Sequence, residues 1–234
     1  MSMVLREELS EGIVAITLNR PESLNALSPA LFSELNQIVT ELSNQTDSVS
    51  CVILRGAGRC FSAGNDLKAV RSGVKAKEKF FQAKTIDLVE KLPQPTIASV
   101  HGHCLTGALE LAIACDLMIT SESANLADTH GKWGMVPGWG MSVRLPRRVG
   151  LLKAKEMMFT GMSINGLQAV EIGLSSQCVA DDHLKVSTLD LAESIVKNSW
   201  HTNFADKKLF LDNENHFHDA SLKMEREQSA SVAS

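Results

Sequence analysis

The chain has 234 residues, of which 44% are hydrophobic and 21% charged, a composition typical of a globular protein with a large buried core. Its net charge of −4, without a long basic run, argues against nucleic acid or an anionic membrane surface as a partner. The five cysteines lack metal-finger spacing, so we expect reduced thiols and no metal site.

The N-terminal segment indicates the cellular compartment of the protein. Residues 1–11 are strongly charged and lack the apolar segment of a secretory signal, so we expect a cytoplasmic protein. The apolar stretch 96–120 contains Glu110 and Asp116, which a membrane span would rarely tolerate. It predicts a buried strand followed by a buried helix.

The first part of the chain alternates between strand and helix patterns. Residues 13–18 are β-rich and run into Asn19-Arg20-Pro21, which predicts a strand that ends in a turn. Ser28-Pro29 is typical of an N-cap followed by proline at the first helical position, and predicts a helix over 29–42. Residues 50–55 predict a second strand.

The middle of the chain begins with a polar, lysine-rich segment, residues 66–84. It predicts a mobile loop beside a site, with a helix over about 77–91. Residues 96–100 then predict a third strand, and residues 107–115 predict the most apolar helix of the protein.

Helices dominate from residue 151 onward, including 166–171 and 184–198. Strands that alternate with helices favour parallel pairing, so the sequence predicts an α/β fold with a helical C-terminal layer.

Two segments carry candidate chemistry. Cys60-Phe61-Ser62-Ala63-Gly64-Asn65-Asp66-Leu67 follows the second strand, and its small residues allow a ligand atom to approach the backbone closely. Such a segment fits either a backbone oxyanion hole or an ordinary glycine turn. The second segment starts the apolar helix at Gly107 and places Glu110 three residues later, on the same helical face.

The free N–H groups of a first helical turn suit an oxyanion, and Glu110 would then lie beside the reacting carbon or water. A carboxylate within an apolar helix is costly unless it is paired or functional. A salt-bridged structural glutamate is the alternative interpretation, and the adjacent helix-start glycine favours the functional one.

Several short motifs follow one another between about residue 5 and residue 200. They are Asn19-Arg20-Pro21, Leu24-Asn25-Ala26-Leu27, Phe61-Ser62-Ala63-Gly64 with Asp66-Leu67, Gly107-Ala108-Leu109-Glu110-Leu111-Ala112 with Cys115-Asp116, Pro137-Gly138-Trp139-Gly140, and Arg144-Leu145-Pro146-Arg147. In this order and spacing they resemble the crotonase superfamily of enoyl-CoA hydratases and isomerases.

The resemblance implies a spiral of ββα repeats with acyl-CoA bound in the core (residues 1–195) and a C-terminal helical region (196–234) that forms trimers or hexamers. It implies oxyanion donors at the backbone N–H groups of Ala63 and Gly107, catalysis at Glu110, and no cofactor beyond the coenzyme A of the substrate. It also implies coenzyme A contacts at Ser23, Leu24, Ala26, Phe61, Asp66 and Leu67, and a backbone contact with the substrate at Gly138. Apart from the resemblance, the extended segment around Cys104 predicts that His103 faces the substrate pocket.

The sequence departs from this family in two places. Family hydratases carry a second glutamate in a Pro-Glu pair, and Thr129-His130 occupies that position here. His130 can act as an acid or base near neutral pH, or it can be a hydrogen-bonded structural residue. The closing segment of the family is also missing after residue 227. This indicates a shorter C-terminal region than in the family, and truncation, an altered acyl pocket and a tail not represented in this sequence are the alternative interpretations.

Two other arrangements of reactive residues were considered. His101, His103 and Cys104 lie on an extended segment whose alternate residues face opposite sides, so we interpret Cys104 as core. Ser62, Asp128 and His130 resemble a triad only in composition, because Gly-x-Ser-x-Gly is absent.

The sequence therefore predicts an enoyl-CoA lyase that hydrates a 2-enoyl-CoA, with His130 as the second catalytic residue. The alternatives are a double-bond isomerase that uses Glu110 alone and a non-catalytic acyl-CoA-binding protein.

Overall fold

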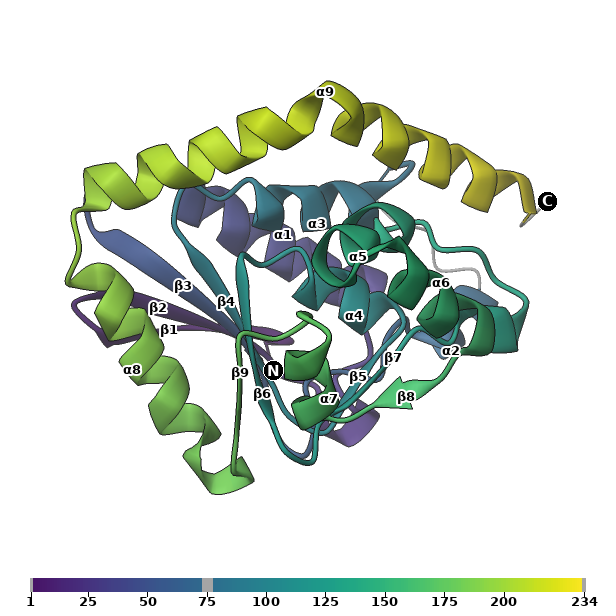
Figure 1. The fold of residues 1–234 in the computed structure, drawn as a ribbon, viewed down its shortest axis with the longest axis horizontal. Helices are drawn as coiled ribbons and strands as arrows, with labels where there is room; N and C mark the ends of the chain where they lie inside the picture. Colours follow the sequence, from purple (N-terminus) through teal and green to yellow (C-terminus); the bar gives the residue numbers. More distant parts are fainter. Residues whose placement is uncertain (1, 73–77, 233–234) are drawn as a thin grey trace.

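The described residues, 2–72 and 78–232 in this computed structural model, form two sheets covered by helices (Figure 1). The strands are β1 (Val4–Ser10), β2 (Gly12–Leu18), β3 (Val49–Gly56), β4 (Thr96–Val100), β5 (His103–Leu105), β6 (Leu117–Ser121), β7 (Asn125–Ala127), β8 (Ser163–Ile164) and β9 (Gln177–Val179). The helices are α1 (Pro29–Ser43), α2 (Leu67–Arg71), α3 (Phe81–Glu90), α4 (Gly107–Ala112), α5 (Met141–Val149), α6 (Leu151–Thr160), α7 (Gly166–Glu171), α8 (Leu184–Val196) and α9 (Trp200–Val232). Three short 3-10 helices are η1 (Pro21–Ser23), η2 (His130–Trp133) and η3 (Asp181–His183).

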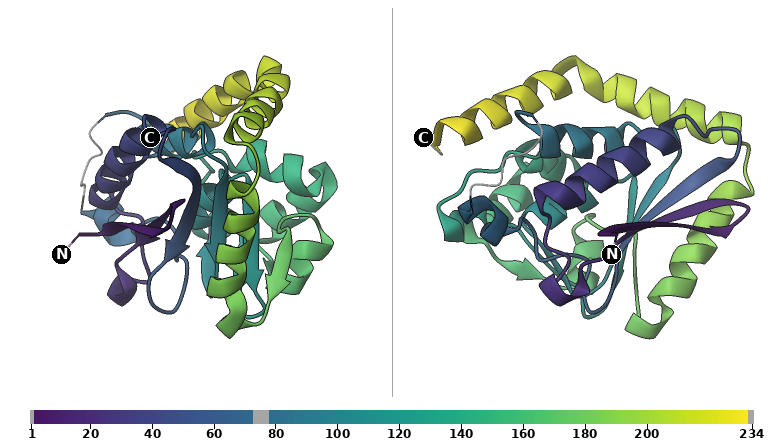
Figure 2. Two further views of the ribbon diagram at one scale, coloured as in Figure 1. Left: turned by 90° about the vertical axis from the view of Figure 1, so that its left-hand side faces the viewer. Right: turned by 180° about the vertical axis from the view of Figure 1, so that it is seen from behind.

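The larger sheet has the strand order β1-β2-β3-β4-β6-β9 and is parallel except for the β1–β2 pair. Helix α8 covers one face, while α1 and α3 lie on the other (Figures 1 and 2). Alternate residues along a strand point to opposite faces, so Ile53 packs toward α8 and Leu54 toward α1 and α3. Both faces are therefore buried, as parallel sheets require.

The smaller sheet, β5-β7-β8, forms a second layer. The chain passes from β4 through β5 into α4, and isolated parallel bridges Leu27–Asn65 and Ser62–Cys104 continue the same layer. This repeat of strand, second-layer strand and helix is the ββα spiral expected from the sequence. It brings the segments that follow β2, β3 and β4 side by side.

Asn25 holds two of these segments together. It is fully buried, has a φ of 53°, and its Nδ2 donates to the carbonyl oxygens of Ala57, Cys60 and Phe61 at 2.8, 2.9 and 3.1 Å. Asparagine tolerates this left-handed backbone conformation better than most residues. The Leu-Asn-Ala-Leu motif thus fixes the loop after β2 against the segment after β3.

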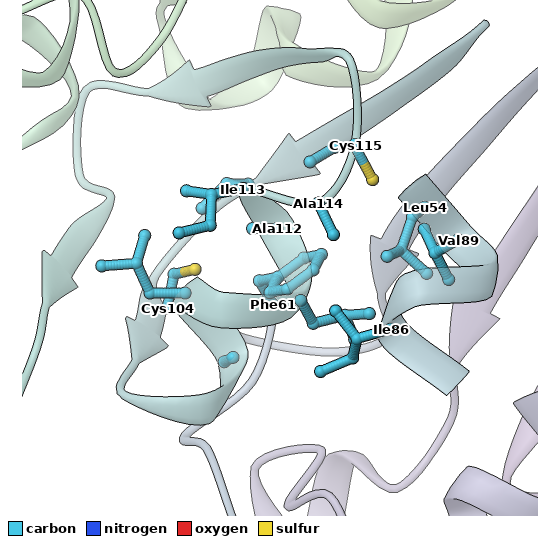
Figure 3. Packing of buried hydrophobic residues seen from close by; sticks show 14 of the residues in the cluster. Leu54, Phe61, Ile86, Val89, Cys104, Ala112, Ile113, Ala114 and Cys115 are labelled. Atoms are coloured by element: carbon cyan, nitrogen blue, oxygen red, sulfur yellow. The ribbon is translucent and has the colours of Figure 1, made fainter. Parts of the chain in front are cut away.

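Phe61 and Cys104 lie in the core (Figure 3). Both are fully buried, and burial raises the pKa of the Cys104 thiol well above its ordinary value. Cys104 is therefore a core residue, as the sequence indicates, and not a nucleophile. The contact predicted for Phe61 needs correction, because its side chain fills the core and lines neither of the cavities described below.

The observed elements differ from the expected ones in a few places. β1 was not predicted, because it is an edge strand whose exposed residues give it a polar pattern. The apolar helix ends at Ala112 rather than Cys115, and the segment predicted as a loop contains α2. Residues 73–77 of that segment, including the predicted start of a helix at 77, lie outside the described residues.

Helix α9 extends across the molecule along the ends of β3 and β4 (Figure 1). Its Lys207 is buried and donates to the Gln94 carbonyl oxygen at 2.9 Å and to Asp116 Oδ2 at 2.7 Å. Asp116 also accepts from the backbone and hydroxyl of Thr96, each at 2.7 Å. The helix is thereby attached to the beginning of β4 and β6.

No helix within residues 2–72 and 78–232 is long and apolar enough to cross a membrane.

Candidate active site

A cavity of about 230 Å³ lies at the beginning of α4. Its lining residues come from the segments that follow β3 and β4 and from the chain around and after η2: Asn65, Thr106, Gly107, Glu110, His130, Gly134, Met135, Val136, Gly138 and Trp139. The structure thus brings together Gly107, Glu110, His130 and Gly138, which the sequence analysis had singled out separately.

Two backbone segments approach each other closely at this cavity. A β-carbon on Gly64, which has a φ of +96°, would lie 2.5 Å from the Leu105 carbonyl oxygen and 3.6 Å from the Gly107 nitrogen. Within the described part of the chain, neither the Asn65 N–H nor the Gly107 N–H has an acceptor. Glycine at 64 is needed because any side chain would separate these two N–H groups.

Ala63 differs from what the sequence suggested. Its N–H donates to the carbonyl oxygen of Leu24 at 2.9 Å, and Ala63 does not line the cavity. The parallel bridge between Leu27 and Asn65 sets this register, so the next unengaged N–H is that of Asn65. Sequence reasoning missed Asn65 as a candidate donor. The hydrogen bond between Ala63 and the distant Leu24 excludes Ala63 as a donor, and no local sequence pattern indicates this bond.

Glu110 is buried, with 1% of its surface exposed, and lies in the first turn of α4. Its Oε1 accepts the backbone N–H groups of Trp139 at 2.8 Å and Met141 at 3.2 Å. Its Oε2 lies 3.7 Å from Nε2 of His130. Hydrogen bonds from backbone N–H groups stabilise a carboxylate, so Glu110 is held in one orientation with one oxygen toward His130.

His130 begins η2 and is 8% exposed. Its Nδ1 lies 2.6 Å from Oδ1 of Asp128, and its backbone N–H donates to the same oxygen at 3.1 Å. Asp128 and His130 are therefore paired, but they do not form a triad with Ser62. Ser62 is engaged elsewhere, since its Oγ donates to the Asn25 carbonyl oxygen at 2.8 Å.

Thr106 links the start of α4 to the residue before His130. It has a φ of 55° and a ψ of −112°, an unusual backbone conformation for a β-branched residue. Its N–H donates to the Ala127 carbonyl oxygen at 2.8 Å, its hydroxyl bonds to that of Thr129, and its Oγ1 accepts the Thr129 N–H at 3.2 Å. These bonds hold the segments that carry Glu110 and His130 in one register.

Trp139 forms the part of the cavity wall next to Gly107. Its ring packs edge-on against Phe32 at a centroid distance of 5.1 Å, and a β-carbon on Gly107 would lie 2.4 Å from it. Its carbonyl oxygen accepts from Arg144 at 2.7 Å, and Arg144 also pairs with Glu90 and Asp87. Trp139 is thus both packed against the core and part of the cavity wall.

A second cavity of about 770 Å³ lies across the Asn65-Asp66 segment. Of the predicted coenzyme A contacts, Ser23, Leu24, Ala26, Asp66 and Leu67 all line it, together with Arg59 and Lys68, both exposed. Because Asn65 lines the first cavity and its neighbour Asp66 the second, the two cavities adjoin at this segment.

Asp66 itself is largely occupied within the protein. Burial acts to raise the pKa of its carboxyl, but the hydrogen bond from Arg20 at 2.9 Å and the N–H groups of Lys68 and Ala69 hold it below its ordinary value. Asp66 therefore starts α2 and ties it to the loop after β2.

His103 needs correction as a pocket residue. It is exposed, its Nδ1 lies 3.4 Å from Asn125, and it lines neither cavity. Pairing of β5 with β7 turns Cys104 inward and His103 outward.

No group of three potential metal ligands occurs among the residues that the structure describes.

Comparison with known proteins extends these observations. The sequence model of the family Enoyl-CoA hydratase/isomerase matches residues 8–232. The chain belongs to the enoyl-CoA hydratase/isomerase family. A short-chain-enoyl-CoA hydratase of Clostridium acetobutylicum is 35% identical over 194 residues, which cover 81% of this chain and 74% of the relative.

Solved structures of this family share the fold. An enoyl-CoA hydratase/isomerase from Xanthobacter autotrophicus Py2 matches with a TM-score of 0.91 and 33% identity, covering 99% of this chain and 87% of the other. A monofunctional enoyl-CoA isomerase from M. smegmatis matches with a TM-score of 0.79 and 30% identity, covering 92% and 95%. The protein is therefore an enzyme of the enoyl-CoA hydratase/isomerase type with the crotonase fold.

Proposed function

We propose that the protein adds water to a 2-enoyl-CoA thioester to form a 3-hydroxyacyl-CoA, and catalyses the reverse dehydration. The observation that carries this proposal is the placement of Glu110 Oε2 and His130 Nε2 at one cavity, 3.7 Å apart. Hydration needs one group to take a proton from water and another to give a proton to the α-carbon. The short-chain-enoyl-CoA hydratase of Clostridium acetobutylicum supports the same substrate class.

The thioester oxygen would be held by the backbone N–H groups of Asn65 and Gly107. Neither N–H has an acceptor within the described residues, and the two segments are in close approach. When water attacks the β-carbon, negative charge moves to this oxygen, and two fixed donors stabilise it without reorganisation. Asn65 replaces Ala63 in this role, because the Ala63 N–H is donated to Leu24.

The proton transfers balance with these two side chains. Glu110 Oε2 accepts a proton as water forms its bond to the β-carbon, and His130 in its imidazolium form gives the Nε2 proton to the α-carbon of the enolate. Transfer of the proton from Glu110 to His130 then restores the starting state, a step that their 3.7 Å separation makes short. No metal or nucleotide cofactor takes part in this scheme.

Coenzyme A would occupy the second cavity, next to Ser23, Leu24, Ala26 and Leu67. Exposed Arg59 and Lys68 at its border suit phosphate groups. The small first cavity, at about 230 Å³, fits a short acyl group better than a long one.

We further propose a cytoplasmic homotrimer or hexamer, with residues 1–195 as the core and 196–234 as the C-terminal helical region. Free cysteines support a reducing compartment. Exposed apolar side chains on α6 support assembly, since Leu152 and Phe159 are 84% and 81% exposed.

Hydration of crotonyl-CoA, measured beside isomerisation of a 3-enoyl-CoA, tests this proposal. Glu110→Gln keeps the shape of the side chain and removes its basicity, so we expect turnover to fall by about 10²-fold or more with thioester binding retained. Unchanged turnover would make Glu110 structural.

His130 variants separate hydration from isomerisation. We expect His130→Ala to depress hydration and His130→Glu to sustain it. Isomerisation that survives His130→Ala, together with slow hydration by the wild type, would support a double-bond isomerase that uses Glu110 alone. Acyl-CoA binding without either reaction would support a binding protein.

A further inference from the structure

We propose that Asp128 is a positioning residue, which fixes the tautomer and charge of His130 so that the Asp128–His130 pair replaces a single glutamate. This inference rests on the proposed hydration, in which His130 delivers a proton to the α-carbon. It assigns a role to a buried carboxylate that the proposed mechanism does not yet use.

The geometry holds the imidazole ring at two points. Asp128 is 1% exposed, and its Oδ1 is 2.6 Å from His130 Nδ1 and 3.1 Å from the His130 backbone nitrogen. Asp128 directly follows β7 and His130 begins η2 two residues later, so the carboxylate and the ring are held by the same short stretch of backbone. A short contact to a buried carboxylate restricts both the position and the rotation of the ring.

The pairing also decides which nitrogen carries the proton. An ionised carboxylate only accepts hydrogen bonds, so Nδ1 must be the protonated nitrogen. In neutral His130, a residue that lines the cavity, the unprotonated nitrogen is then Nε2, which lies 3.7 Å from Oε2 of Glu110. Nε2 can therefore receive a proton from Glu110 and pass it to a substrate carbon.

The charge of the pair is the same as that of a glutamate. With neutral His130 the pair carries −1, and with protonated His130 it carries 0, as ionised and protonated carboxyl groups do. A lone histidine would instead alternate between 0 and +1 beside the buried Glu110. Asp128 thus keeps the charge balance of a two-carboxylate site although residue 130 is a histidine.

Few other charges act on His130 from the elements around it. Glu110 on α4 and Asp128 both lie against its ring, with Glu110 Oε2 at 3.7 Å from Nε2 and Asp128 Oδ1 at 2.6 Å from Nδ1. Lys132 on η2 and Lys155 and Glu156 on the neighbouring α6 are exposed. Exposed charges are screened by solvent, so Asp128 and Glu110 dominate.

Nitrogen NMR of ¹⁵N-histidine-labelled protein tests the tautomer without any activity. The His130 signals are assigned by their loss in His130→Gln. We expect Nδ1 to be the protonated nitrogen in the neutral ring of the wild type, and Asp128→Asn to lower the pH at which the ring loses its second proton. A neutral ring protonated at Nε2 in the wild type would overturn the proposal.

Kinetics then test whether Asp128 acts through His130. We expect Asp128→Asn to lower kcat for crotonyl-CoA hydration by about 10-fold or more, with KM within about 3-fold and the histidine limb of the pH profile shifted to lower pH. In a His130→Glu background the same change should leave kcat within about 3-fold, because no ring remains to be positioned.

Equal losses in the two backgrounds would show that Asp128 supports the fold rather than His130. The proposed function can fail separately: if His130→Ala hydrates at the wild-type rate, His130 has no acid/base role, while the NMR result still decides the tautomer.

Discussion

Replacing Gly107 by alanine should damage both stability and turnover. The new β-carbon would lie 2.4 and 2.9 Å from two ring carbons of Trp139, whereas carbon atoms in contact stay about 3.5 Å apart. The ring or the start of α4 must therefore move by about 1 Å. Trp139 cannot move outward without losing its contact with the fully buried Phe32.

The size of the effect follows from this overlap. Overpacking of a buried contact costs about 1–3 kcal/mol, which lowers the melting temperature of a chain of this size by about 2–12 °C. A shift of Trp139 also moves the N–H that holds Glu110, and a shift of Gly107 moves a proposed oxyanion donor. Loss of one such donor lowers kcat by about 10²–10³-fold.

Thermal unfolding and crotonyl-CoA hydration measure the two effects. Gly131→Ala is a matched control in the neighbouring η2, because the nearest atom to its β-carbon would be the Met158 carbonyl oxygen at 3.8 Å. We expect that variant to retain the wild-type melting temperature and kcat. A Gly107→Ala protein with the same melting temperature and kcat as Gly131→Ala would refute the packing argument.

Three further outcomes are expected. Arg144→Met removes the buried guanidinium that pairs with Asp87 and Glu90, while Arg226 still pairs with Asp87, so the free energy of unfolding in urea should fall by about 3 kcal/mol. Because the pKa of Asp66 is lowered in the folded protein, its contribution to stability is complete above about pH 4 and is lost as the pH falls through the folded pKa. Asp66→Asn should therefore reduce the loss of stability as the pH falls below about 4 in acid titrations of unfolding. Phe159→Glu should dissociate the proposed oligomer in analytical ultracentrifugation, and an unchanged mass would place the interface elsewhere.

Local pattern was enough to predict much of the fold. The Ser28-Pro29 signal did begin a helix, with the Ser28 hydroxyl accepting the Leu31 N–H at 3.2 Å, because an N-cap is a local interaction. The spacing between Gly107 and Glu110 likewise placed both at one cavity. β1 was not predicted because it is a largely exposed edge strand, whose sequence lacks the alternation of apolar and polar residues that marks a half-buried strand.

Residues whose orientation depends on distant contacts were harder to predict. Nothing near Ala63 indicates that its N–H is used by Leu24, so sequence could not separate Ala63 from Asn65 as a donor. His103 faces outward because of the register between β5 and β7, a pairing that sequence analysis had not foreseen. Asp128 was noticed only as part of an improbable triad, since its contact with His130 depends on the turn after β7.

The main-chain origin of the two proposed oxyanion donors has an evolutionary consequence. Apart from proline at position 65, which would remove that N–H group, substitutions leave both donors in place as long as Gly64 and Gly107 are retained. Residues 110, 128 and 130, in contrast, contribute through their side chains and can be exchanged one at a time. A protein with this site can therefore acquire a new proton-transfer group while each successive variant keeps the proposed thioester-binding donors. The type of reaction can thus change gradually during evolution.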